Sequence, residues 1–366
     1  MDSKKIFIYV LGTAQDGGYP HFGCKEECCQ SVWGGISKQR SPSCLALVDM
    51  NVGKYWLFDI TPEVKNQIHI LDQFNCSLGG VFITHAHVGH YMGLINFGLE
   101  IIKIGIPLFV LLRGNHWSEI QYAKDTIYKD KIMQKVLDVR ADVAEKVFAG
   151  ATVVLPICKY LIDIVKEHHP TQKMDVFVEG VDSSKWYDKE GMNLQHPCVG
   201  LLQDANWWRK TREMLVLENV VKSMPNIHFY WAGDGQYKDK ILEVLDKFDN
   251  FHWLGSLEYP DKVREYLTEI DIYAIITGMD TTPLSLKEAQ LMENPVIATD
   301  VGGNSETMKD GETGFLVKEG DDKDLIEKIS LLINDKELSQ KLGKQGCNFI
   351  QQEYSLEASA KNFLKI

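Results

Sequence analysis

The second half of the chain alternates short apolar runs with amphipathic runs, and this alternation is the feature that most constrains its fold. From Pro197 onward, the helix-like runs DKVREYLTEI and PLSLKEAQLMEN separate the apolar runs HFYWA, NFHWLG, DIYAIITG and PVIAT. Continuous apolar runs of this length are typical of strands buried on both faces, and intervening helices allow neighbouring strands to run parallel. The pattern predicts a doubly wound α/β domain that binds ligands at the carboxyl ends of its strands.

Three turns that follow these strands contain candidate binding residues. Glycines in them let a ligand approach the backbone, the free N–H groups of a helix beginning near Pro283 suit a diphosphate, and carboxylates bind sugar hydroxyls strongly. The candidates are Gly233, Asp234 and Gly235 in WAGDG, Asp280, Thr282, Pro283, Leu284, Ser285 and Glu288 in GMDTTPLSLKEA, and Gly302 and Gly303 in DVGGNSE. Taken singly, each turn is weak, and Glu288 could be a solvated helix residue or Asp280 a helix cap.

Together, these motifs resemble the donor-binding domain of GT-B glycosyltransferases of family 4. The resemblance runs through WAGDG, EYPDKVREYLTEIDIYAIITG and PLSLKEAQLMENPVIATDVGGNSETMKDGETGFLV to the final helices. It implies that Glu288 binds the ribose hydroxyls of a nucleotide, that Asp280 holds sugar hydroxyls, and that the backbone around Thr282 to Ser285 holds sugar and phosphate groups. It further implies transfer of a hexose from a nucleotide sugar to a glycan, lipid or protein acceptor, with retention of anomeric configuration and without a metal.

The chain departs from that family where the diphosphate would bind. The family usually has an arginine just after the first strand of this domain and a lysine shortly afterwards, which neutralise the departing phosphate. In CVGLLQDANWWRKTRE, Leu201 stands at or near the arginine position, and Arg209 and Lys210 are the downstream candidates. Arg209 and Lys210 are therefore predicted to neutralise the charge of the departing diphosphate during sugar transfer.

The middle segment also alternates between strand and helix patterns. We expect strands at Ile106–Leu112, Ala151–Leu155 and Met174–Val178, and helices at Trp117–Val136 and Lys159–His168. The run GATVVLPICKYLIDIVKEHHPTQKMDVFVEGVDSSKWY resembles the second part of the GT-B N-terminal domain, which implies that Arg113 or His116 faces the donor sugar. The alternative is that Arg113 caps carbonyl groups and His116 is a solvated helix start.

A cluster of histidines follows a predicted strand in the first hundred residues. The motif THAHVGHYMGL places His85, His87 and His90 at the end of Gly80–Thr84, and neutral imidazole is a common ligand of zinc or iron. The motif and the glycine-rich Gly12–Gly18 turn resemble the first half of a metallo-beta-lactamase fold, in its pyrroloquinoline-quinone biosynthesis B-like branch. The resemblance implies that His85 and His87 bind a first metal and His90 a second.

Two departures weaken this metal site. Gly89 stands where the signature has aspartate, and the resemblance stops near Leu99, before the later ligands. A competent hydrolase is therefore not expected, although a metal-dependent hydrolase or oxidoreductase remains one alternative function. A second alternative is a fusion of two truncated folds, with a seam near residues 95–108, that binds nucleotide sugar with little or no turnover.

Composition limits the number of domains, the classes of partner and the location that we expect. A chain of 366 residues, 45% hydrophobic and 25% charged, is long enough for two cores, and a net charge of −12 disfavours nucleic-acid binding. Without a long apolar run or signal-peptide core, we expect a cytoplasmic protein with no transmembrane segment. Of the eight cysteines, the group at Cys24, Cys28, Cys29 and Cys44 could bind zinc, but free thiols are favoured.

These patterns divide the chain into three parts. Residues 1–105 resemble half of a metallo-beta-lactamase fold, and residues 106–179 resemble part of a GT-B N-terminal Rossmann domain. Residues 180–366 resemble a GT-B nucleotide-sugar-binding domain whose last helix, Ala358–Leu364, crosses back toward the N-terminal domain. The expected fold class is α/β.

Overall fold

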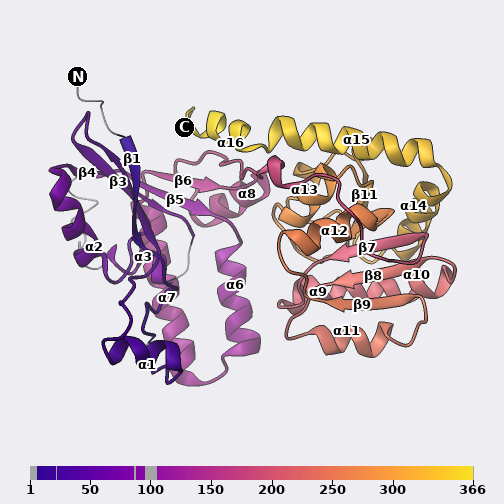
Figure 1. Ribbon diagram of the computed structural model, residues 1–366, viewed down its shortest axis with the longest axis horizontal. Helices are drawn as coiled ribbons and strands as arrows, with labels where there is room; N and C mark the ends of the chain where they lie inside the picture. The colour runs from indigo at the N-terminus through magenta and orange to yellow at the C-terminus, as the bar shows by residue number, and fades with distance from the viewer. Residues whose placement is uncertain (1–5, 22, 86–87, 95–104, 366) are drawn as a thin grey trace. The chain divides into compact units, whose positions relative to one another are not determined.

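The computed structural model describes residues 6–21, 23–85, 88–94 and 105–365 (Figure 1). The chain divides into two compact units, each built on a six-stranded sheet. The N-terminal unit comprises residues 1–157 and 161–176, and the C-terminal unit comprises residues 158–160 and 177–366.

The sheet of the N-terminal unit joins two segments that the sequence patterns separated. Its strands, in spatial order, are β1 (Ile6–Gly12), β2 (Cys44–Asp49), β3 (Lys54–Phe58), β4 (Ser77–Ile83), β5 (Leu108–Leu112) and β6 (Val153–Pro156). The pairs β1–β2 and β2–β3 are antiparallel and the others parallel. Strands β4 and β5 pair across the expected division at residue 105, with Val81 opposite Leu108. Residues on both sides of that division therefore share one sheet.

Two elements of this unit differ from the expectations. The helix expected at Trp117–Val136 is wrong as a single element, because Asp130 accepts hydrogen bonds from the N–H groups of Ile132 and Met133 and thereby caps a new helix. The strand expected at Met174–Val178 is also absent; only Met174 forms a bridge, to Val154 of β6. The helices are α1 (Glu27–Trp33), α2 (Val64–Leu71), α3 (Val88–Tyr91), α6 (His116–Tyr122), α7 (Lys131–Gly150) and α8 (Lys159–His168), with short turns η1 (Asp72–Phe74) and η2 (Ala123–Ile127).

The sheet of the C-terminal unit is entirely parallel. Its strands are β7 (Cys198–Leu202), β8 (His228–Ala232), β9 (Phe251–Gly255), β10 (Ile272–Ile275), β11 (Val296–Thr299) and β12 (Phe315–Val317), in the spatial order β12-β11-β10-β7-β8-β9. This order confirms the predicted doubly wound sheet. The strand order reverses between β7 and β10, which is where such sheets form their ligand crevice.

Helices cover both faces of this sheet. Val199, Leu201 and Trp231 belong to one buried cluster, whereas their neighbours Cys198 and Tyr230 belong to another, so alternate strand residues point to opposite faces. The helices are α9 (Trp208–Thr211), α10 (Leu217–Ser223), α11 (Lys238–Leu245), α12 (Asp261–Glu269), α13 (Leu284–Leu291), α14 (Asp322–Asn334), α15 (Lys336–Glu353) and α16 (Leu356–Phe363), with η3 (Ser183–Lys185), η4 (Arg212–Val216) and η5 (Asn304–Glu306).

Two observations concern the described residues of both units. All eight cysteines lie within the described residues, and each has a free thiol. Within the same residues, none of the helices combines the length and apolar character that a membrane crossing requires.

Candidate functional site

An ion pair lies at the reversal of strand order in the C-terminal unit. Lys210 is on α9, after β7, and Asp280 is on the loop after β10; Lys210 Nζ lies 2.8 Å from Asp280 Oδ2. Their side chains are 21% and 11% exposed. Burial alone lowers the pKa of Lys210, but the charge of Asp280, its hydrogen bond and the charge of Asp204 outweigh burial and raise it. Lys210 is thus held as a cation where the strand order reverses. Arg209, the other basic candidate, has an exposed side chain.

The buried side chain of Gln203 links the segment that follows β7 to the segment that follows β10. Its amide donates to the carbonyl of Ile276 over 2.8 Å, and its Oε1 accepts from the N–H of Ile276 at 3.0 Å. These bonds extend the pairing of β7 with β10 beyond the last strand residues. Sequence patterns did not identify Gln203, because its role depends on a partner more than seventy residues away.

The glycines of DVGGNSE bring two loops into backbone contact. A Cβ atom on Gly302 would lie 1.8 Å from the carbonyl oxygen of Asp280, and one on Gly303 would lie 2.0 Å from that of Thr281. Gly302 also has a φ of +57°, which favours glycine. The N–H of Gly303 donates to the carbonyl of Asp280 over 3.3 Å. The two glycines therefore set the position of the Asp280 loop.

The Gly-Asp-Gly turn after β8 packs against the loop after β7. A Cβ on Gly233 would lie 2.0 Å from the carbonyl oxygen of Gln203, and one on Gly235 would lie 2.5 Å from the carbonyl carbon of Ala205. Asp234 is exposed, and its Oδ1 accepts from the N–H of Gly235 over 2.7 Å. The turn thus places the exposed carboxylate of Asp234 beyond the carboxyl ends of the strands.

Glu288 is a buried carboxyl group on α13. It is 4% exposed, and its Oε1 accepts a hydrogen bond of 3.1 Å from the Tyr259 hydroxyl. Burial raises its pKa to about 7, against the opposing effects of Tyr259 and Lys287. A carboxyl group that titrates near neutrality is a common property of binding sites. The expectation that Glu288 could be a solvated helix residue is wrong.

Polar groups also surround the start of α13. Pro283 precedes its first turn, and Leu284 is 40% exposed. The Thr282 hydroxyl is buried and forms no hydrogen bond with the part of the chain that the structure describes. Ser285 Oγ accepts from the Tyr273 hydroxyl over 2.8 Å. The helix start thus offers N–H groups beside an uncommitted hydroxyl.

In the N-terminal unit, His90 lies between two carboxylates. Its Nδ1 lies 2.7 Å from Asp59 Oδ2, and its Nε2 lies 3.2 Å from Asp16 Oδ1. The hydrogen bond to Asp59 is the main cause of the raised pKa of His90. The His85 ring lies with its centroid 3.9 Å from that of His90. His87, the third predicted ligand, lies outside the described residues.

Asp16 fills the space next to Gly89. A Cβ atom on Gly89 would lie 2.3 Å from Asp16 Cγ, so no side chain fits at position 89 while Asp16 stays in place. Two ligands of a tetrahedral zinc ion lie about 3.3 Å apart, given bonds of about 2.0 Å. The 3.2 Å separation of Asp16 Oδ1 and His90 Nε2 fits such a pair, with Asp59 orienting the imidazole from its other nitrogen.

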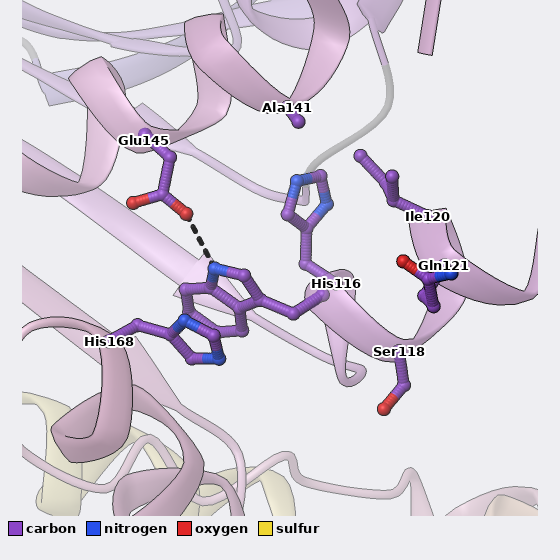
Figure 2. Close-up of a pocket in the computed structure, with 8 residues that line it drawn as sticks. His116, Ser118, Ile120, Gln121, Ala141, Glu145 and His168 are labelled. Carbon is purple, nitrogen blue, oxygen red and sulfur yellow. Dashed lines mark hydrogen bonds between the residues drawn. The ribbon is translucent and has the colours of Figure 1, made fainter. Parts of the chain in front are cut away.

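A pocket of about 430 Å³ lies in the N-terminal unit around His116 (Figure 2). His116 is 3% exposed, and neither ring nitrogen forms a hydrogen bond with a described residue. Burial, assisted by Arg140, lowers its pKa to about 4, so the ring is neutral at pH 7. Beside His116, Trp117 Nε1 donates to Glu145 over 2.6 Å, and the indole stacks on His168 with 4.1 Å between centroids. His116 starts α6 as expected, but the expectation that it is solvated is wrong.

Comparisons with known proteins relate parts of the chain to two groups of proteins. Residues 214–349 match the family described as glycosyl transferases group 1. The chain is 42% identical over 85 residues to the capsular polysaccharide biosynthesis glycosyltransferase CapM of Staphylococcus aureus, covering 21% of this chain and 22% of that protein. It is 27% identical over 134 residues to coenzyme PQQ synthesis protein B of Klebsiella pneumoniae (strain 342), covering 31% of this chain and 43% of that protein. The chain thus spans less than half of either relative.

Solved structures extend the similarity to most of the chain. Sucrose-phosphate synthase from Thermosynechococcus elongatus superposes with a TM-score of 0.66 at 16% identity, covering 83% of this chain and 75% of that one. Anabaena Alr3699/HepE in complex with UDP and glucose superposes with a TM-score of 0.58 at 14% identity, covering 82% and 88%. The chain has an α/β fold with one mixed and one parallel sheet, and its structural neighbours are GT-B glycosyltransferases.

Proposed function

We propose that the chain is a glycosyltransferase that moves a hexose from a nucleotide sugar to a glycan, lipid or protein acceptor, with retention at the anomeric carbon. The observation that carries the proposal is the Lys210–Asp280 pair at the strand-order reversal, on the same sheet edge as the start of α13. Both residues were candidates from the sequence, and the fold brings their side chains into contact.

Each group has a chemical role in such a reaction. Asp280 and Glu288 accept hydrogen bonds from sugar and ribose hydroxyls, and charged acceptors bind hydroxyls more strongly than neutral ones. Lys210 neutralises the charge that develops on the departing diphosphate. Before the donor binds, Asp280 balances this cation across 2.8 Å. When phosphate takes over that role, Asp280 is released to bind the sugar.

The start of α13 supplies the uncharged part of the site. The first N–H groups of a helix and its positive dipole end favour a phosphate group. The buried Thr282 hydroxyl adds one further donor at that position. This combination of a helix start, a cation and two carboxylates favours a diphosphate joined to hydroxyl-bearing rings.

Calorimetric titration of the full chain with UDP-, GDP- and ADP-hexoses tests donor binding. We expect one donor to bind, and we expect Glu288→Gln and Asp280→Asn to bind it at least tenfold more weakly. Glu218→Gln is the matched control, because Glu218 pairs with Lys247 on the exposed surface of the same unit. Equal affinity in all four proteins would refute the assigned site. Donor binding without any transfer or hydrolysis would instead favour the fusion that binds without turnover.

A second candidate function is divalent-cation binding at Asp16 and His90, with zinc or iron as the metal. The observation that favours it is that Asp16 stands in the space beside Gly89 and lies 3.2 Å from His90 Nε2. Zinc titration of metal-stripped protein should show affinity that falls at least tenfold in Asp16→Asn. Asp72→Asn is the control, because Asp72 contacts the exposed His69 in the same manner. Unchanged zinc affinity in Asp16→Asn would exclude this site.

A further inference from the structure

A cluster of potential metal ligands lies at the amino ends of two strands in the sheet of the C-terminal unit, away from the carboxyl ends that position Lys210 and Asp280. Cys198 is the first residue of β7, Asp271 directly precedes β10, and His196 lies two residues before β7. Because β7 and β10 are paired in parallel, their amino ends meet at one edge of the sheet. This edge lies at the other end of the same two strands that position Lys210 and Asp280. The proposed transfer reaction does not use the cluster.

The three ligand atoms are spaced as zinc requires. His196 Nδ1 lies 2.8 Å from Asp271 Oδ2 and 3.8 Å from Cys198 Sγ, and all three ligand atoms lie within 4.8 Å of one another. Bonds of about 2.0 Å to nitrogen or oxygen and about 2.3 Å to sulfur place tetrahedral ligands about 3.3 to 3.6 Å apart. The two separations from His196 Nδ1 lie within about half an ångström of that geometry, whereas Cys198 Sγ and Asp271 Oδ2, which are within 4.8 Å of each other, close on the ion by a shift of up to about an ångström.

The other nitrogen of His196 has the partner that a metal-binding imidazole usually has. His196 Nε2 lies 2.9 Å from Glu269 Oε1, near the end of α12. A carboxylate in this position holds the ring with Nδ1 directed at the metal and makes that nitrogen a better ligand. Gly191 makes room for this carboxylate, since a Cβ there would lie 1.9 Å from Glu269 Oε2.

An ion can reach the cluster from solvent. A hollow of about 580 Å³ is lined by His196, Asp271, Leu332, Lys336 and Gln340. His196 and Asp271 are exposed, whereas Cys198 is fully buried beneath them. The hollow thus gives solvent access to the two exposed ligands, and the buried thiol lies within 4.8 Å of both.

We propose that His196, Cys198 and Asp271 bind one zinc ion and that Glu269 acts as a positioning residue for His196. A set of one nitrogen, one sulfur and one oxygen ligand suits zinc better than magnesium or calcium, which prefer oxygen ligands alone. On binding, the Cys198 thiol releases its proton to solvent, and His196 binds through Nδ1 while its Nε2–H donates to Glu269. The ion would join the chain before β7 to the start of β10.

Metal titration of the EDTA-stripped full chain tests this site, with cobalt as a spectroscopic substitute for zinc. We expect Cys198→Ser to lose one equivalent of zinc and the corresponding thiolate-to-cobalt absorption band, and Asp271→Asn to bind zinc at least tenfold more weakly. Cys347→Ser is the control, because Cys347 is another buried thiol of the same unit, bonded to the carbonyl of Leu291. It should retain the metal and the band.

Two outcomes would overturn the proposal. One is identical zinc stoichiometry in wild type and Cys198→Ser, which would leave His196 simply ion-paired between two carboxylates. The other is unchanged zinc affinity in both Asp271→Asn and Glu269→Gln, and these variants decide the question if Cys198→Ser does not fold. Glu269→Gln should weaken binding about tenfold while the three ligands remain, an effect that loss of an ordinary surface ion pair would not produce.

Discussion

Lys210 Nζ lies 2.8 Å from Asp280 Oδ2 beyond the carboxyl ends of β7 and β10, the paired strands at which the strand order reverses. Three strands, β8, β9 and β10, lie between the two residues along the chain, and the parallel sheet places them together. The fold therefore holds the Lys210 cation against a carboxylate at this end of the sheet.

Replacing Lys210 with alanine should lower kcat more than it raises KM. A cation directed at developing charge stabilises the transition state more than the bound substrate, and loss of such a group costs on the order of 10²- to 10³-fold in kcat. Steady-state kinetics with the donor found by titration provide the measurement. Lys247→Ala, which removes an exposed lysine, should behave as wild type; an equal loss in both variants would contradict the role given to Lys210.

Replacing Glu288 with glutamine should stabilise the fold while impairing donor binding. The carboxyl titrates near pH 7 in the folded chain and near 4.5 when exposed, so the folded state binds the proton more tightly. Stability contributed by the protonated form is complete below pH 4.5 and is lost as pH rises through 7, up to ~3 kcal/mol. Denaturant unfolding should therefore show the largest gain for Glu288→Gln at pH 8, and no gain at pH 8 would contradict the prediction.

Donor affinity of the wild type should rise with pH for the same reason. Only the ionised form of Glu288 offers two acceptor oxygens to ribose hydroxyls. With a pKa of about 7, titration from pH 6 to pH 8 should strengthen binding about tenfold. Calorimetry at both pH values measures this, and Glu288→Gln should show a nearly flat profile.

His116 should make the N-terminal unit sensitive to acid. Its pKa is lowered to about 4 from 6.5, so the unfolded chain binds the proton more readily. The stability contributed by the neutral ring is present above pH 6.5 and is lost as pH falls toward 4, by up to ~3 kcal/mol. His116→Leu should remove much of this dependence in unfolding experiments, whereas His69→Leu, at an exposed histidine, should retain it. Parallel profiles for His116→Leu and wild type would contradict the assignment.

Replacing Gly303 with alanine should disturb the Asp280 loop. The added methyl group would lie 2.0 Å from the Thr281 carbonyl oxygen, and relief of such an overlap typically costs about 1 to 3 kcal/mol. Gly34→Ala is a control, since a Cβ there lies 3.4 Å from its nearest neighbour, an ordinary contact. Thermal unfolding and donor titration should both detect the change in Gly303→Ala.

The sequence predicted elements that depend on local pattern. The helix Lys159–His168 has the expected bounds, because it is marked by its own periodicity and adjacent turn residues. The break at Asp130 was also recognisable, since an aspartate before a new amphipathic run is a helix start. The sequence pattern does not separate the two helices, because charged residues continue on both sides of Asp130.

The sequence could not predict features that depend on distant partners. The burial of His116, the bond from Tyr259 to Glu288 and the contact of Asp16 with Gly89 each join residues from separate elements. No periodicity links such positions. The glycine turns combine a predictable and an unpredictable feature. Their position after the carboxyl ends of strands follows from the local pattern, but the loops that they contact do not.

The contact of Gly302 and Gly303 with the Asp280 loop uses main-chain atoms alone. Side chains on that loop can therefore be exchanged without altering the spacing between the loops. A library that varies Thr281 but retains both glycines would test, at the proposed donor site, whether sugar preference changes while the spacing of the loops is kept.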